Sequence, residues 1–148
     1  MKKKNFGTCG SLSLIDIELR EPFFVTNGDV LSSLDYESLL ECHKEQNVVA
    51  TMCIREENYQ TPYGVIEVNG KNNIVSIKEK PIKKFYINTG IYVLEPEVLN
   101  YIPKNEFFDL PSLFRLLKDN NKNIKSYKIT DYWIDIGEPS DYKAIKKN

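Results

Sequence analysis

The spacing of apolar positions changes twice within the first third of the chain. Residues 22–26 form an apolar run of strand length, and residues 48–54 form another. Between these runs, apolar side chains recur every three to four positions behind Asp35, which favours the N-cap of a helix, and this spacing ends near Gln46. A strand, a helix and a second strand make a βαβ unit, so the pattern predicts a parallel strand pair with a right-handed crossover.

The middle of the chain carries the pattern of a β-hairpin. Residues 65–68 and 74–77 are rich in β-branched side chains, and an Asn-Gly turn over residues 69–73 separates them. The rest of the pattern predicts strands over residues 91–94, 124–129 and 133–136, a short helix from residue 95, a helix capped by Asp109 and a closing helix over residues 139–145. We therefore expect one α/β domain over residues 1–148, with helices packed on a mixed sheet.

Composition narrows the class of protein. The 20 basic and 21 acidic side chains give a net charge of −1, so we expect neither nucleic acid nor a membrane as a partner. No run approaches the roughly 18 apolar residues of a membrane helix, and no apolar segment of a secretory signal precedes Gly7. Three cysteines without Cys-x-x-Cys spacing predict neither a disulfide framework nor a zinc site, and they favour a cytoplasmic location.

Six of the seven glycines lie at the edges of predicted strands or in tight bends, where ligands of α/β proteins commonly bind. They are Gly7, Gly10, Gly28, Gly64, Gly90 and Gly137. The polar residues beside them are the first candidates for chemistry. The segment Asn88-Thr89-Gly90 either makes a plain turn before a strand or presents amide and hydroxyl groups to a sugar. His43, the only histidine, is expected to be a surface or half-buried residue of its helix rather than a catalytic residue.

Two carboxylates and one lysine beside glycine or proline are candidates for a phosphate and metal site. Asp29 follows the most apolar strand, where its oxygen suits Mg²⁺, although the Asn-Gly before it is also a common turn. Asp135 lies in an apolar run, which is costly for a charge unless it is paired or metal-bound; the alternative is an edge strand with Asp135 in water. Pro81 favours an extended Lys80, which either contacts phosphate or belongs to a solvated charge run.

Six segments in the same order resemble the sugar-phosphate nucleotidyltransferases, and the closest subgroup is the mannose-1-phosphate guanylyltransferase-like enzymes. The segments are Gly7-Thr8-Cys9-Gly10, Val25-Thr26-Asn27-Gly28-Asp29, Pro62-Tyr63-Gly64-Val65, Glu79-Lys80-Pro81, Asn88-Thr89-Gly90-Ile91-Tyr92 and Trp133-Ile134-Asp135-Ile136-Gly137. Each segment alone is a weak signal, but together they cover nearly the whole chain. The resemblance implies a partial Rossmann-like nucleotide-diphospho-sugar transferase fold.

The resemblance also implies roles for individual residues. Asp29 and Asp135 would hold Mg²⁺ and would form the catalytic set together with Lys80, which would meet the sugar phosphate. The nucleotide-binding positions would be Gly7, Thr8, Gly10, Asn27 and Gly28. The sugar-binding positions would be Tyr63, Gly64, Glu79, Asn88, Thr89 and Gly90.

The reaction that the resemblance implies is an in-line attack of a sugar 1-phosphate oxygen on the α-phosphorus of a nucleoside triphosphate, from which pyrophosphate leaves. The attacking phosphate is largely ionised at neutral pH because its second pKa is about 6, so no general base is needed. Catalysis then depends on positioning, Mg²⁺ and cationic side chains. The subgroup favours GTP as the triphosphate and leaves the sugar open.

The chain departs from the family pattern in two places. Cys9 stands where the family usually has alanine. More importantly, the family's Gly-x-Gly-x-Arg loop and Pro-Lys pair, which hold the triphosphate, are absent before Gly7. We therefore expect an amino-terminally truncated domain that is inactive or weakly active alone. We also expect an exposed sheet edge that favours a homodimer or another pairing.

Two other functions fit parts of the sequence. A non-catalytic sugar-phosphate-binding or assembly module of the same fold would keep the same motifs. A retaining glycosyltransferase of related fold is disfavoured, because such enzymes tend to show an Asp-x-Asp metal motif and the chain offers only Asp16-Ile17-Glu18.

Overall fold

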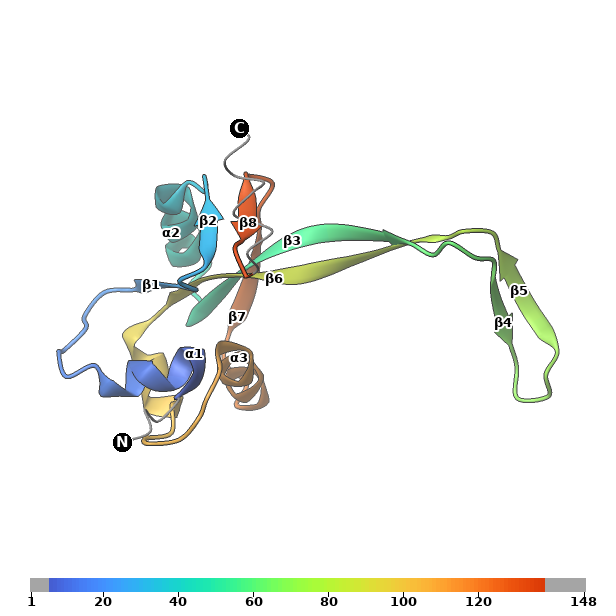
Figure 1. Cartoon of the computed structure of the whole chain (residues 1–148). Helices are drawn as coiled ribbons and strands as arrows, with labels where there is room; N and C mark the ends of the chain where they lie inside the picture. Colours follow the sequence, from blue (N-terminus) through green and yellow to red (C-terminus); the bar gives the residue numbers. More distant parts are fainter. Residues whose placement is uncertain (1–5, 138–148) are drawn as a thin grey trace. The chain divides into compact units, whose positions relative to one another are not determined.

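A computed structural model of the chain describes residues 6–137 and divides the molecule into two compact units (Figure 1). The first, which we call the core unit, comprises the residues up to Ile54 and those from Asn88 onward. The second, which we call the hairpin unit, comprises Arg55–Ile87. No helix in residues 6–137 is long and apolar enough to cross a membrane.

The main sheet has four strands in the order β1-β6-β3-β7. Strand β1 (Phe23–Thr26) runs antiparallel to β6 (Ile82–Leu94), whereas β3 (Ala50–Gln60) runs parallel to β7 (Ile124–Lys128). The prediction of a mixed sheet is confirmed. The predicted parallel pairing of the first two apolar strands is wrong, because β6 lies between β1 and β3. The last four residues of β6, Ile91–Leu94, are buried on both faces, which suits a central position.

Two faces of this sheet carry separate apolar clusters, as the alternation of side chains along β6 requires. Tyr92 and Leu94 belong to the cluster that includes α3, whereas Ile91 and Val93 belong to the cluster that includes α2. Each cluster buries one stripe of a helix against the sheet. The core unit is therefore a layered α/β structure, which confirms the predicted fold class.

Both long helices begin where the sequence predicts. Helix α2 (Tyr36–Glu45) starts after Asp35, whose carboxylate accepts hydrogen bonds from the backbone N–H groups of residues 37 and 38. Helix α3 (Leu110–Asp119) starts after Asp109, which accepts from the N–H of Ser112 at 2.7 Å. These bonds satisfy donors that a helix start leaves free. The predicted short helix after residue 95 is the 3₁₀ helix η2 (Pro96–Tyr101).

Several shorter elements complete the described chain. Helices α1 (Gly7–Gly10) and η1 (Ser11–Leu14) were not predicted, because their eight residues are too few to show a helical period. Strand β2 (Val30–Ser32) pairs antiparallel with β8 (Trp133–Asp135). The helix predicted for residues 139–145 lies outside the described residues.

The hairpin unit contains the predicted hairpin. Strands β4 (Val65–Val68) and β5 (Ile74–Lys78) pair antiparallel, with a bulge between Glu67 and Val68. The Asn69 side chain accepts hydrogen bonds from the backbone N–H groups of Lys71 and Asn73 and so fixes the turn. Strands β3 and β6 extend into this unit well beyond their predicted ends. The outer part of β3 carries mainly charged and polar side chains, and the outer part of β6 mixes lysines with exposed Ile82, Phe85 and Tyr86, so neither shows the pattern of a buried strand.

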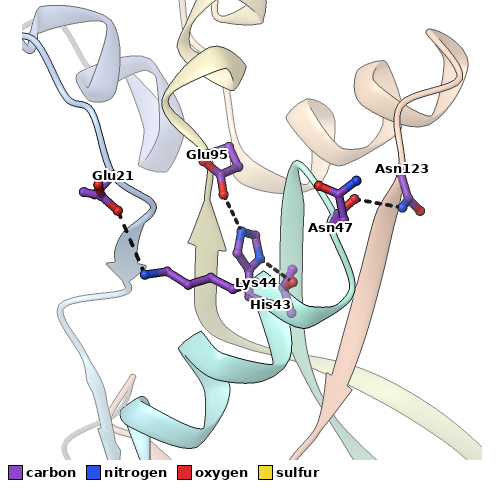
Figure 2. Close-up of polar contacts among 7 residues, drawn as sticks. Glu21, His43, Lys44, Asn47, Glu95 and Asn123 are labelled. Carbon is purple, nitrogen blue, oxygen red and sulfur yellow. Dashed lines mark hydrogen bonds and ion pairs between the residues drawn. The ribbon is translucent and has the colours of Figure 1, made fainter.

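His43 is buried, with 1% of its surface exposed, so the prediction of a surface or half-buried position is wrong. Its Nδ1 lies 2.7 Å from the Thr51 hydroxyl oxygen, and its Nε2 lies 3.3 Å from Oε1 of Glu95 (Figure 2). Because a carboxylate can only accept, Nε2 carries the proton, and Nδ1 of the neutral ring accepts the hydrogen bond of Thr51. This network joins α2 to β3 and to the residue after β6, and the apolar period of a helix gives no sign of it.

We predict that the His43 network makes the protein lose stability on mild acidification. Burial lowers the pKa of His43 below its usual 6.5, and the nearby Glu95 only partly opposes this shift. Below pH 6.5 the unfolded chain therefore binds a proton that the folded chain does not. Above pH 6.5 the contribution of His43 to the free energy of unfolding is expected to stay constant. At lower pH this free energy is expected to decrease, by at most about 1.4 kcal/mol per pH unit from this group.

Urea unfolding between pH 7 and pH 5 measures this effect. Because His43 is the only histidine, the variant His43→Gln is expected to flatten the upper part of the profile. A profile with the same slope in both proteins between pH 7 and pH 6 would show that His43 is not the titrating group.

Candidate functional site

The turn after β1 packs directly on β6. The backbone N–H of Asn27 donates to the carbonyl of Gly90 at 2.9 Å. Gly90 has φ +74°, and a Cβ atom placed there would lie 2.7 Å from Nδ2 of Asn27. Glycine is therefore required at this position both by the backbone conformation and by the close approach. The interpretation of residues 88–90 as a plain turn is excluded, since they lie inside β6.

Asp29, the turn residue just before β2, lies beside the end of β8 that carries Asp135, although 106 positions separate the two in the sequence. In the β2–β8 pair, Val30 is opposite Asp135, and the N–H of Ile136 donates to the Asp29 carbonyl at 2.7 Å. Both aspartates are exposed. The structure thus brings the backbones of the two predicted metal residues together at one end of a short antiparallel ribbon.

The chemistry of these two residues fits Mg²⁺ that is shared with phosphate. Residues 6–137 contain no cluster of three or more His, Cys, Asp or Glu side chains that could enclose a metal ion. Mg²⁺ commonly binds through one or two carboxylates and completes its octahedron with water and substrate phosphates. Two exposed carboxylates match that pattern and do not match a closed structural site.

The other polar residues of this part of β6 are engaged within the protein. The Thr89 side chain is 1% exposed and donates from its hydroxyl to the Cys53 carbonyl at 2.9 Å. The Thr89 carbonyl accepts from Nε1 of Trp133 at 2.8 Å. Thr89 therefore ties β6 to β3 and to β8, and its hydroxyl points into the protein. Trp133 is not among the predicted site residues, and its sequence signal is its place two residues before Asp135.

Asn88 is exposed but held at both ends of its amide. Its Oδ1 accepts from the N–H of Gly90 at 3.0 Å, and its Nδ2 donates to the Tyr92 hydroxyl at 2.6 Å. Burial raises the pKa of the Tyr92 phenol, which the bond from Asn88 partly offsets. The side chain of Asn88 is thereby fixed at the start of the buried end of β6. Tyr92 was not among the predicted site residues.

The segment Gly7–Gly10 is a short helix held by the residues before α3. The N–H groups of Cys9 and Gly10 donate to the Phe108 carbonyl at 3.0 and 2.9 Å, and Oγ1 of Thr8 accepts from the N–H of Leu110 at 3.3 Å. Gly7 has φ +74°, and a Cβ there would lie 2.6 Å from the Phe108 oxygen. The glycines of this segment allow a close contact within the protein.

The remaining predicted residues lie together in the hairpin unit. A Cβ atom at Gly64 would lie 3.0 Å from Oε2 of Glu79, so these two residues are direct neighbours. Lys80 has a positive φ of 44°, so the expected extended conformation of this residue is wrong, and its carbonyl accepts from Nε2 of Gln60 at 3.3 Å. The Tyr63 side chain is 75% exposed. The unit thus places the Glu79 carboxylate against Gly64, and Tyr63 and Lys80 are the chain neighbours of these two residues.

Comparisons with known proteins agree with the motifs. The profile of the family described as Nucleotidyl transferase matches residues 2–148. A UTP–glucose-1-phosphate uridylyltransferase of Synechocystis is 33% identical over 97% of this chain and 40% of its own length. A mannose-1-phosphate guanyltransferase of Schizosaccharomyces pombe is 32% identical over 96% of this chain and 41% of its own length.

Solved structures give the same result. The crystal structure of HddC from Yersinia pseudotuberculosis matches with a TM-score of 0.66 and 27% identity, covering 99% of this chain and 64% of HddC. A second structure of HddC is a complex with GMP-PN. The matches define the nucleotide-diphospho-sugar transferase fold. The chain belongs to the Nucleotidyl transferase family, whose relatives are sugar-1-phosphate nucleotidyltransferases. It spans about 40% of the length of the curated relatives named above.

We predict that Gly90→Ala disturbs both stability and the turn that carries Asp29. The left-handed conformation alone costs an alanine about 1–2 kcal/mol, and the contact with the Asn27 side chain adds to this. The matched control is Gly70→Ala in the hairpin turn, where a Cβ meets nothing within 4 Å and φ is not positive. Thermal or urea unfolding measures the difference. Equal stability of the two variants would contradict the close packing of Asn27 on β6.

Proposed function

We propose that the chain forms the metal-binding and sugar-phosphate-binding part of a sugar-1-phosphate nucleotidyltransferase. The observation that carries this proposal is the β2–β8 pairing, in which Asp135 is opposite Val30 and the backbone of Asp29 bonds to the N–H of Ile136. Glu79, which lies beside Gly64, and Lys80, which follows it in the chain, support the sugar side. Family membership supports the general reaction, whereas Mg²⁺ dependence and release of pyrophosphate belong to the proposal.

The reaction follows from the charges involved. A sugar 1-phosphate oxygen attacks the α-phosphorus of a nucleoside triphosphate, the bond from this phosphorus to the bridging oxygen of the β-phosphate breaks, and pyrophosphate leaves with the electron pair. Bound Mg²⁺ would neutralise developing negative charge on the phosphates. Asp29 and Asp135 would hold the ion, Lys80 would orient the attacking phosphate, and Glu79 would accept hydrogen bonds from sugar hydroxyls. No side chain needs to remove a proton from the attacking phosphate.

The partners of this site are a nucleoside triphosphate and a sugar 1-phosphate. GTP is favoured because several relatives are named mannose-1-phosphate guanyltransferases and one structural neighbour is a complex with GMP-PN. The proposal includes a cytoplasmic location, where these metabolites are made. It also includes pairing of two chains through β1, an edge strand of the described sheet.

A non-catalytic module that binds sugar phosphate is the second candidate. The 148 residues contain no Gly-x-Gly-x-Arg segment to hold the triphosphate. The same Asp29, Asp135 and Glu79 would serve binding without transfer. Only the enzyme would show turnover, whereas both candidate functions predict binding of a sugar phosphate.

We predict that these 148 residues alone show no turnover, or only a trace, when pyrophosphate release is measured with Mg²⁺, common nucleoside triphosphates and several sugar 1-phosphates. The reason is the missing triphosphate loop, whose amides and cations supply much of the charge stabilisation. Fast turnover that Asp135→Ala abolishes and Asp119→Ala preserves would contradict this prediction and would establish the chain as a self-sufficient enzyme. Asp119 is a suitable control because it is an exposed carboxylate at the end of α3.

A binding measurement with a sugar 1-phosphate distinguishes a working sugar-phosphate site from a chain that no longer binds this ligand. Mannose 1-phosphate with Mg²⁺, titrated by NMR, is expected to shift signals of the hairpin unit, and Glu79→Gln is expected to weaken binding about tenfold. The matched control is Glu67→Gln, which removes an exposed carboxylate of β4 that interacts with Ser76 and Lys78. Equal affinity of both variants, or no binding by the unaltered chain, would rule out this site.

A further inference from the structure

An open apolar groove lies between α3 and β7 in the core unit, on a different set of residues from the proposed site. Figure 1 shows these two elements side by side. The groove has a volume of about 530 Å³, and its apolar lining comes from Met52, Pro111, Phe114 and Ile124. Phe114 is buried and the other three are half-buried. Apolar surface of this kind on a soluble protein commonly marks a binding surface.

The rim of the groove is positively charged. Arg115 and Lys118 on α3 and Lys125 on β7 line it, and none of its lining residues is acidic. All three cations are exposed, and none takes part in the ion pairs found within residues 6–137. In a chain with a net charge of −1, this is a local concentration of positive charge around apolar surface. Its complement is an anionic ligand with an apolar part.

Strand β7, which lines the groove, is an edge strand of the described sheet. β7 is at the end of the sheet order and pairs with β3 on one side, and no other strand in the described part of the chain pairs with it. Lys125 and Ser126 of this strand line the groove. A second copy of β7 would bring Lys125 and Lys128 against like charges, which disfavours self-pairing. An acidic strand that paired with the same edge would instead be attracted by these lysines.

We propose that the α3–β7 groove binds an extended acidic segment of a partner protein. The segment would place one large apolar side chain between Met52 and Phe114 and would set its carboxylates against Arg115, Lys118 and Lys125. Its backbone would run along the free edge of β7, as in other cases of strand addition. Cations on both α3 and β7 suit a segment with several carboxylates better than a small molecule with one anionic group. The proposal is independent of nucleotidyl transfer.

The test uses the ¹⁵N-labelled chain and unlabelled peptides of the form Asp-Glu-Val-X-Val-Glu-Asp, with Phe, Leu or Ile at X. At least one of these peptides is expected to cause saturable shifts in the amide signals of β7 and α3 below about 1 mM, and added salt is expected to weaken them. Replacing X by Ala, or the acids by Lys, is expected to abolish the shifts. Absence of shifts with all three peptides, or shifts centred elsewhere, would overturn the proposal.

Variants on the exposed rim keep the test independent of folding. The double variant Lys118→Glu with Lys125→Glu is expected to weaken the peptide about tenfold or more, whereas Lys104→Glu, an exposed lysine that does not line the groove, is expected to leave affinity unchanged. Ser126→Phe, which fills the groove, is expected to block binding. Equal weakening by Lys104→Glu would indicate unspecific charge attraction and overturn the proposal. Binding of decanoate at the groove without binding of any peptide would overturn it in favour of a small amphiphile.

Discussion

The core unit depends on the way the end of β6 is buried between its neighbours. The hydroxyl of Thr89 donates a hydrogen bond to the Cys53 carbonyl of β3, and the Thr89 carbonyl accepts one from Trp133 of β8. The next residue, Gly90, lies so close to Asn27 that no side chain fits there. From there, Ile91–Leu94 send alternate side chains into the two apolar clusters. A buried strand with these fixed hydrogen bonds leaves little freedom for the strands beside it.

The same packing explains how distant residues come together. Asn27 is held on β6, so the turn that follows it carries Asp29 to a defined place, and Trp133 is held on β6, so β8 carries Asp135 to the neighbouring strand. The hydroxyl of Thr89 and the amide of Asn88 are used for this positioning. Both aspartates are exposed. The buried residues thus fix the positions of the two aspartates, which in the proposed function would hold Mg²⁺.

Local signals in the sequence predicted local structure well. Asp35 and Asp109 cap helices because their carboxylates satisfy free N–H groups, and the Asn-Gly turn at residue 69 closes a hairpin, all within a few positions. The place of β6 between β1 and β3 was missed, since strand order depends on contacts between residues far apart. His43 was misplaced for the same reason: its partners, Thr51 and Glu95, lie on other elements. Asp29 and Asp135 could be proposed from the sequence because Asp29 follows Gly28 after an apolar run and Asp135 lies inside an apolar run that ends at Gly137. The supporting roles of Trp133 and Tyr92 leave no such mark.

If Asp29 and Asp135 form one metal site, as proposed, Mn²⁺ bound there lies close to both residues. Mn²⁺ favours the same oxygen ligands as Mg²⁺ and broadens the NMR signals of nearby nuclei. Substoichiometric Mn²⁺ added to the ¹⁵N-labelled chain with a sugar 1-phosphate is expected to broaden the amides of residues 28–30 and 134–136 together. In Asp135→Asn both sets of signals are expected to stay sharp, whereas Asp119→Asn is expected to behave like the unaltered chain. Broadening of residues 28–30 alone, or broadening that persists in Asp135→Asn, would contradict a shared site.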